Sequence, residues 1–564
     1  MPVVEQQAQS QPAPMAAVQG QTETQQPSLQ EGMTTDPASL RGGGEGGEWK
    51  YHLRSSLHPV LFAAVYRLVD GIFAAFSESS TLRQAALLYS PKLVQGVFAA
   101  IGDYYTWKLA CRAYGEHSQA AQATLFMTLL NPWQWYCSVR TFSNSLEMTI
   151  TTVALSMWPW HLLQSRGGLQ VKENNKAHLS PSAIGNLRLS LFLAAVAVLL
   201  RPTNIIIWLA VFTCTVSAAR SLSTLVVLVS QGVLYGLLAL SLSVASDRFF
   251  FGEWVFPPFQ WLYFNLNQDL AVFYGRNDVT YYLSQGLPLL TTTQLPFALY
   301  GLYRAYQKRQ GPVARTLALS VFSMCGALTL VAHKEVRFIY PLLPALHVVA
   351  APSLTSFFSG SSEWKWRGIM HKRVLVVSVL INVVIAGYLG SMHQRAAVSV
   401  LDFVRSEYAA YMTGGAPDID AQLQRPKGER PFVLFLMPCH TTPWRSHLIY
   451  KSLEARALTC EPPLHTAPRS SERENYRSEN DRFYDNPTLF LATEIWPKDT
   501  AWILPRYIAG FDGVDQHVMN FMHAAEGSHV NMQLTEVWRG QNGLFNEDWR
   551  RRGDVVVWEV ESGI

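Results

Sequence analysis

Long apolar stretches separated by short polar connections run through the middle of the chain. Each is about 17–25 residues long, or half of a closely spaced pair, which is the length needed to cross a hydrocarbon core of about 30 Å. We expect spanning helices near residues 88–109, 119–136, 147–164, 189–200, 203–219, 222–246, 286–304, 313–332, 338–357 and 374–391. The pattern predicts a mainly α-helical, multi-spanning membrane protein with about ten transmembrane helices.

Two apolar stretches leave alternatives open. Residues 189–219 form either one long span or a pair broken at Arg201-Pro202, because proline interrupts a helix. Residues 59–76 are short for a span and contain Arg67 and Asp70. We therefore expect an interfacial or half-buried helix there rather than a spanning one.

The two ends of the chain have a different composition. Residues 1–47 are rich in Gln, Pro, Ser and Gly without apolar periodicity, which predicts a disordered leader with no signal-peptide core. We expect residues 48–391 to be the multi-spanning domain. Residues 392–564 alternate Pro-containing loops with strand-like runs such as PFVLFLM and DVVVWEV, which predicts a small soluble α/β domain.

Charge and cysteine content exclude several classes of protein. Only 15% of the 564 residues are charged and the net charge is +4, with no basic run that would indicate nucleic-acid binding. The six cysteines lack zinc spacing. Cys439 and Cys460 either pair in an oxidising compartment or remain free thiols. For Cys439, His440 and His447, structural packing is favoured over a metal site.

The distribution of basic residues predicts the orientation in the membrane. The loops at 165–178, 303–315 and 363–373 are rich in Lys and Arg, which places them on the cytoplasmic side. Counting crossings from there brings the remaining polar clusters and the C-terminal domain to the opposite face. The polar clusters therefore converge on one side of the membrane.

The sequence AHKEVRFIYPLLP, residues 332–344, concentrates charge between two apolar runs. A charged side chain at membrane depth costs about 2.5–3.5 kcal/mol even on the mild insertion scale. His333, Lys334 and Arg337 form a positive patch on the face where basic residues are disfavoured. Such a patch suits an anionic head group or a leaving phosphate, with Glu335 orienting its neighbours. The alternative is a short loop whose basic residues merely contact lipid head groups.

A second polar cluster, RTFSNSLE at residues 140–147, leads into an apolar stretch. By itself it is typical of a capped helix start with an acidic first turn. Arg140 and Asn144 near the same membrane face add the alternative of a sugar- or phosphate-facing role, and Glu147 belongs to the same cluster.

Two further segments have both a functional and a structural interpretation. The aromatic-rich loop at 248–288, which carries Asp269, is long for an interfacial belt and suits a lipid-linked substrate. WKYHLRSSLHPVLF places Arg54 and His58 before a short apolar helix, where a juxtamembrane linker is the simpler interpretation.

Several of these segments together resemble a known family. HKEVRFIYPLLP is similar to the signature HKEERFLxPxxP, and RTFSNSLE, RPTN (201–204) and the region from Asp269 to Tyr274 and Gly275 match further blocks. The sequence resembles, over roughly 48–564, the multi-spanning dolichyl-phosphate-mannose-dependent mannosyltransferases of the endoplasmic reticulum, glycosyltransferase family 22. The resemblance implies a GT-C-like fold and a multi-pass location in the endoplasmic reticulum membrane.

The resemblance also implies a reaction. YYLSQGLP and FLMPCHTTPWRSH are similar to the branch that builds glycosylphosphatidylinositol (GPI) anchors. A mannosyltransferase of that branch moves the third mannose from dolichyl phosphate mannose to a two-mannose lipid-linked precursor, in α-1,2 linkage and with inversion. This requires a base on the acceptor hydroxyl and a stabilised leaving phosphate. His333, Lys334 and Arg337, with Arg140 and Arg201, suit the phosphate, and no metal or other cofactor is expected.

One departure from the family pattern leaves the catalytic residues unassigned. The family has a first span and then an acidic loop, F-x-P-D-E-x-F/W-Q, whereas the resemblance here begins at Glu48-Trp49. We therefore expect a truncated form that lacks the acidic pair. The alternatives are a related mannosyltransferase of the N-glycan pathway or of the fourth anchor mannose, an inactive form, and a transporter. The transporter is disfavoured because the polar residues gather at one face rather than at the midplane.

Overall fold

The computed structural model describes most of the chain after residue 51. The described residues are 52–76, 80–164, 181–219, 221–266, 273, 275–359, 365–412, 432–450, 452–463, 466–467, 470–498, 504–524, 527, 530–546 and 548–562. The expected leader at 1–47 lies outside them, as do Asp269 and Tyr274. The predicted domain boundaries stay predictions.

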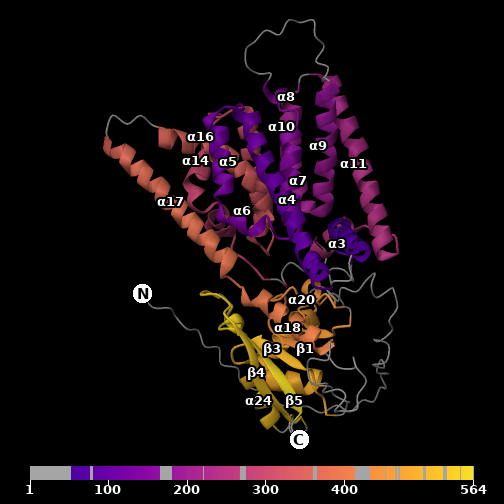
Figure 1. Ribbon diagram of the computed structural model, residues 1–564. Helices are drawn as coiled ribbons and strands as arrows, with labels where there is room; N and C mark the ends of the chain where they lie inside the picture. Colours follow the sequence, from indigo (N-terminus) through magenta and orange to yellow (C-terminus); the bar gives the residue numbers. More distant parts are fainter. Residues whose placement is uncertain are drawn as a thin grey trace. The chain divides into compact units, whose positions relative to one another are not determined.

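Helices make up nearly all of the described chain before residue 391 (Figure 1). The first half contains α3 (Leu57–Phe76), α4 (Ser80–Tyr114), α5 (Gln119–Leu129), α6 (Pro132–Cys137), α7 (Ser143–Met157), α8 (His161–Gln164), α9 (Pro181–Leu200), η1 (Pro202–Asn204), α10 (Ile205–Ala218) and α11 (Leu222–Phe251). The second half contains α12 (Pro257–Leu266), η3 (Tyr282–Gly286), α13 (Leu287–Thr291), η4 (Thr292–Gln294), α14 (Leu295–Tyr306), α15 (Pro312–Thr329), η5 (Val336–Leu342), α16 (Leu343–Ser359) and α17 (Lys365–Ser391).

Three of the expected spans are interrupted, each at a local signal. The stretch 119–136 divides into α5 and α6, because Asn131 caps a new helix by accepting a hydrogen bond from the N–H of Gln134 (2.8 Å). The stretch 147–164 divides after Met157, next to Pro159. The stretch 286–304 is irregular around Thr292, whose φ of 49° is left-handed.

The alternatives at 189–219 are resolved in favour of a pair. α9 ends at Leu200 and α10 begins at Ile205, and Arg201 and the short turn η1 join them. Figure 1 shows the chain reversing between the two helices. The break follows from Pro202, which cannot donate the backbone hydrogen bond that a continuous helix needs.

Six helical segments of the described chain are long and apolar enough to cross a membrane. They are Leu82–Tyr114, Pro181–Leu200, Leu222–Phe251, Pro312–Thr329, Val336–Ser359 and Ile369–Met412. Their exposure differs: only 11% of the apolar window in Leu222–Phe251 is buried, against 78% in Val336–Ser359. α11 therefore faces lipid with most of its surface, whereas α16 lies inside the bundle. The expected count of about ten spans stays a prediction.

Close helix packing surrounds α16. Its residues from Leu343 to Ala351 are all buried, and the helix packs against α5, α14 and α15. A Cβ added to Gly301 on α14 would lie 2.3 Å from the carbonyl oxygen of Val349, so only glycine permits this approach. Small residues at such contacts let helix backbones approach closely in a membrane, where packing rather than water drives association.

The region after residue 391 forms a five-stranded sheet with covering helices. The strands are β1 (Val433–Leu436), β2 (Ala455–Ala457), β3 (Tyr507–Phe511), β4 (Met532–Gly540) and β5 (Val555–Ser562), in the order β2-β1-β3-β5-β4. β2, β1 and β3 are parallel, and β5 is antiparallel to both β3 and β4. The strand-like runs in the sequence correspond to β1 and β5.

Helices cover both faces of this sheet. The cluster on one face includes Val400 and Val404 of α18 (Ala396–Met412), and that on the other includes Val518 of α24 (Val514–His523). The remaining short helices are α20 (Trp444–His447), α21 (Ser471–Glu474), α22 (Glu479–Asp485), α23 (Pro487–Phe490), η6 (Leu491–Ile495) and η7 (Trp549–Arg551).

The two cysteines of this region are joined. Cys439 and Cys460 form a disulfide with a Cα–Cα distance of 5.9 Å, which confirms the pairing over the free-thiol alternative. Cys439, His440 and Cys460 are also the one group in the described chain with metal-ligand spacing. The disulfide occupies both sulfur atoms, and a metal would need at least one of them as a thiolate.

Candidate functional site

A cleft of about 190 Å³ lies where several chain breaks meet. Its walls come from the segment before α3, the α9–α10 turn, the start of α12 and the connection between α15 and η5. The lining residues are Leu53, Arg54, Ser55, Leu199, Leu200, Arg201, Pro202, Thr203, Pro257, Pro258, Trp261, Asn265, Val331, His333, Glu335, Arg337, Phe338 and Pro462. Five residues that the sequence singled out, Arg54, Arg201, His333, Glu335 and Arg337, therefore share one cleft.

Glu335 organises the HKEVR segment. Its carboxylate contacts His333 Nε2 at 2.9 Å and accepts a hydrogen bond from Arg337 Nη2 at 2.7 Å. Burial alone would raise the pKa of Glu335, but the hydrogen bonds from His333 and Arg337 outweigh it and lower the pKa to about 2. Glu335 thus remains ionised at neutral pH, and its role is to orient two neighbours rather than to accept a proton.

Lys334 points away from the cleft. It is 3% exposed, its Nζ donates to the carbonyl oxygen of Asn277 (3.1 Å), and its backbone N–H donates to the Asn277 side chain (2.7 Å). A buried ammonium group needs such partners. Lys334 therefore fastens the HKEVR segment to the loop before η3, and it does not line the cleft beside His333 and Arg337.

A buried network behind the cleft connects Glu147 with two of the arginines. The Glu147 carboxylate is 1% exposed and accepts a hydrogen bond from Asn204 Nδ2 at 2.8 Å. Arg201 Nε lies 3.9 Å from the same carboxylate. Asn144 Nδ2 donates to the Arg337 carbonyl oxygen (3.1 Å) and lies 3.4 Å from Glu147 Oε2. RTFSNSLE thus begins a helix, but the expected cap and acidic first turn are wrong, because Phe142 stands at the N-cap without a side-chain hydrogen bond and Glu147 lies beyond the first turn. Its polar side chains support the cleft instead.

The sequence did not point to the residue that holds the Arg54 segment in place. Asp247, near the end of α11, is fully buried and accepts hydrogen bonds from Ser56 N–H (2.6 Å), Ser56 Oγ (2.8 Å) and Ser55 Oγ (3.1 Å). The only signal was one carboxylate near the end of an apolar run, where carboxylates are costly. Its partners lie about 190 residues earlier in the chain.

Besides Lys334, Asn144 and Glu147, two more of the expected residues in the described chain, Arg140 and His58, are absent from the cleft lining. Arg140 is exposed, stacks on Tyr136 with its guanidinium 3.8 Å from the ring centroid, and donates to the Tyr136 carbonyl. His58 packs edge-on against Phe62, and burial followed by the nearby Arg54 charge lowers its pKa to about 4, so it is neutral near pH 7. Asp269 and Tyr274 lie outside the described residues.

The charge and shape of the cleft indicate its ligand. Three guanidinium groups face it, and the two nearby carboxylates, Glu335 and Glu147, are both engaged with basic or amide groups. Arginine offers paired donors that match phosphate oxygens. Leu199, Pro257, Trp261 and Phe338 supply apolar wall. The cleft can hold an anionic group next to a hydrocarbon or a sugar face.

Comparison with known proteins identifies the family. Residues 45–449 match the Alg9-like mannosyltransferase family. The chain is 47% identical to GPI mannosyltransferase 3 of Gibberella zeae, covering 91% of this chain and 87% of that protein. It is 40% identical to GPI mannosyltransferase 3 of Aspergillus fumigatus (91% and 71% covered) and 30% identical to that of Schizosaccharomyces pombe (91% and 90%).

A solved structure has a similar fold. ArnT from Cupriavidus metallidurans, crystallised with undecaprenyl phosphate, superposes with a TM-score of 0.52 at 13% identity, covering 90% of this chain and 88% of that one. At this identity the likeness concerns the fold alone. The fold neighbour and the matched relatives confirm a mainly helical membrane protein and the family that the sequence motifs indicated. The chain belongs to the Alg9-like mannosyltransferase family and is a membrane-bound glycosyltransferase.

Proposed function

We propose that this chain transfers the third mannose of the GPI anchor, in α-1,2 linkage, from dolichyl phosphate mannose to a two-mannose lipid-linked precursor. The reaction takes place on the luminal face of the endoplasmic reticulum membrane. The similarity to GPI mannosyltransferase 3 of several fungi supports the activity. The cleft is the observation that supports the use of a phosphate-linked donor.

In this proposal the cleft neutralises the phosphate that departs as the glycosidic bond breaks. Arg54, Arg201 and Arg337 approach one volume from three separate segments, so charge that develops on the phosphate oxygens meets donors that are already oriented. Glu335 holds Arg337 and His333 in place through its ionised carboxylate. These fixed cations supply the charge that a divalent metal supplies in other phosphate sites.

The apolar wall has a matching role. Leu199, Leu200, Pro257, Pro258 and Trp261 lie beside the arginines in the same cleft. α11, which precedes α12, exposes a largely apolar surface along its length. The cleft can therefore bind the phosphate of a polyprenyl-linked donor at the arginines and the adjoining hydrocarbon chain at the apolar wall.

The activity is tested with the purified chain, dolichyl phosphate mannose and the two-mannose GPI precursor. We expect a three-mannose product whose new residue is removed by an α-1,2-specific mannosidase. Arg337→Ala should lower the rate at least tenfold, because the Arg337 side chain is 49% exposed in the cleft and takes the phosphate charge. Arg188→Ala is the control. Arg188 is an exposed arginine on α9, and its side chain donates a hydrogen bond to Gln231.

The outcomes separate the proposal from its rivals. Transfer to the two-mannose precursor with wild-type rates for Arg188→Ala and low rates for Arg337→Ala supports both the activity and the site. Equal rates for the two variants refute the role of the cleft and leave the activity standing. Transfer to a dolichol-linked oligosaccharide, or to a three-mannose anchor precursor, in place of the two-mannose one refutes the proposed step.

A further inference from the structure

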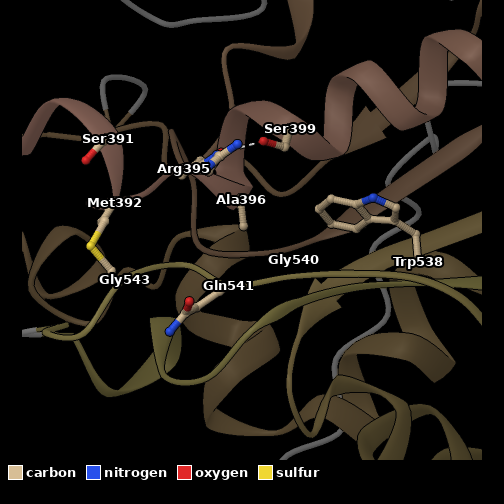
Figure 2. A pocket seen from close by; sticks show the side chains of 9 residues that line it. All are labelled: Ser391, Met392, Arg395, Ala396, Ser399, Trp538, Gly540, Gln541 and Gly543. Carbon is tan, nitrogen blue, oxygen red and sulfur yellow. Dashed lines mark hydrogen bonds between the residues drawn. The ribbon is translucent and has the colours of Figure 1, made fainter. Parts of the chain in front are cut away.

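A second cavity of about 290 Å³ lies away from the cleft, where α17, α18 and β4 meet. Figure 2 shows its ring of residues: Ser391, Met392, Arg395, Ala396, Ser399, Trp538, Gly540, Gln541 and Gly543. Nothing in the mannosyl transfer proposed above requires this cavity.

The cavity lies at the boundary of the membrane. α17 is 27 residues long and exposes apolar side chains such as Val377, Leu380 and Val384 along most of its length. Such a helix is long and apolar enough to cross the hydrocarbon layer, and its last residue, Ser391, lines the cavity. The turn that follows, and the first residues of α18, are therefore at the level of the lipid head groups.

Two exposed apolar side chains are held rigidly beside this boundary. Leu544 and Phe545 are 60% and 74% exposed. The Tyr388 hydroxyl accepts hydrogen bonds from both of their backbone N–H groups, at 3.1 and 3.3 Å. Gly543 permits this close approach, since its φ is +112° and an added Cβ would lie 3.3 Å from the Tyr388 hydroxyl. Exposed Leu and Phe side chains beside the end of such a helix are of the kind that insert at the boundary between head groups and acyl chains.

The cavity wall is mainly apolar, with Met392, Ala396 and Trp538 in its lining, and it carries one positive charge. Arg395 and Gln541 provide donors, Trp538 provides an aromatic wall, and the lining contains no acidic residue. The Ser399 hydroxyl donates to the Arg395 carbonyl oxygen at 3.2 Å. Arg539, the neighbour of Trp538 on β4, differs from Arg395 in having acidic partners. It forms ion pairs with Asp512, Glu536 and Asp554. The positive charge of Arg395 is thus not matched by a carboxylate within the cavity.

We propose that this cavity binds the head group of an anionic membrane phospholipid, with Leu544 and Phe545 placed among its acyl chains. Arg395 meets the phosphate, and the Gln541 amide adds a hydrogen bond. An anionic lipid is favoured over a zwitterionic one because the lining offers no carboxylate to a choline or ethanolamine group. The bound lipid fixes α18 and the sheet region to the membrane surface, and this site is independent of the mannosyl transfer proposed above.

The test uses the purified chain in nanodiscs with a photoactivatable phosphatidylserine, followed by mapping of the crosslinked peptides. We expect crosslinks to the peptides that contain Arg395 and Gln541, and about a fivefold lower yield for Arg395→Gln, from the attraction of one basic residue to anionic lipid. Arg552→Gln, an exposed arginine of the same region that is absent from the lining, should match the wild type. Leu544→Ser with Phe545→Ser should also lower the yield.

Competition identifies the ligand source. Excess phosphatidylglycerol should suppress the crosslink, and neither phosphatidylcholine nor inorganic phosphate should do so at equal concentration. Equal yields for Arg395→Gln and the wild type, equal suppression by phosphatidylcholine, or crosslinks confined to other peptides would each overturn the proposal. The unfolding temperatures of the variants show whether each is folded in the nanodisc.

Discussion

Glu147 offers the sharpest test of how the cleft is held together. Its buried carboxylate accepts from Asn204, lies 3.9 Å from Arg201 Nε, and reaches the Arg337 backbone through Asn144. One side chain therefore supports two of the three arginines that face the cleft. We predict that Glu147→Ala loses most of the mannosyl transfer while the protein still inserts into the membrane.

The size of the effect follows from these contacts. Removing the acceptor leaves the buried amide groups of Asn204 and Asn144 without it, at a cost of about 1–3 kcal/mol each. The Arg201 side chain keeps 15% exposure and its contact is long, so it adds little, and a total of about 3 kcal/mol is appropriate. If that stabilisation is lost in the transition state, the rate falls about 100-fold. Glu147→Gln keeps the volume and an acceptor for Asn204, so we expect about a tenfold loss, the equivalent of one hydrogen bond to a charged group.

Initial rates at varied donor concentration measure this effect, with the unfolding temperature recorded for each variant. The control is Glu116→Ala, which removes an exposed carboxylate paired with Lys108 and should change neither quantity by much. If Glu147→Ala lowers the unfolding temperature but leaves kcat/KM per folded molecule unchanged, Glu147 is only structural. A Glu147→Ala enzyme within twofold of the wild type would refute the reasoning altogether.

Two further predictions concern residues whose roles only the structure revealed. Asp247→Asn replaces a carboxylate oxygen, which accepts hydrogen bonds from Ser55 and Ser56, with an NH₂ group that cannot accept them. We therefore expect a lower unfolding temperature and a several-fold higher KM for the donor. Thermal unfolding and donor titration measure these two quantities. Lys334→Met keeps the apolar stem and loses the bond to Asn277 and the attraction to Asp278, neither of which lies in the cleft, so its rate should stay within about threefold of the wild type. A loss for Lys334→Met as large as that for Arg337→Ala would instead place Lys334 at the phosphate.

The ends of the helices were predictable where a local signal exists. Pro202 divides 189–219 into two helices because the missing N–H is a property of that residue alone. The divisions of 119–136 and 147–164 follow equally local signals, Asn131 as a cap and Pro159 as a breaker. Apolar composition alone predicts continuous spans there and is wrong, because it does not distinguish one helix from two short ones and because, unlike Pro202, these signals were not weighed against it.

The candidate site was predictable as a set of segments but not as a set of side chains. The segments that carry Arg54, Arg201 and Arg337 do meet at one cleft, as the orientation argument indicated. Lys334 adjoins His333 in sequence, yet it is directed to Asn277 and away from the cleft. Sequence spacing in an irregular connection does not fix the direction of a side chain, and the nearest long-range partner decides it.

The sequence by itself determined that this protein is a helical membrane protein, because hydrophobic length is a local property that the bilayer thickness selects. Its motifs also determined the family. Only the tertiary structure decided that Glu147, Asn204 and Asp247 support the cleft, because each acts through partners that lie far away in the chain and meet it only after the helices pack. A buried carboxylate needs such partners, and no pattern of neighbouring residues names them.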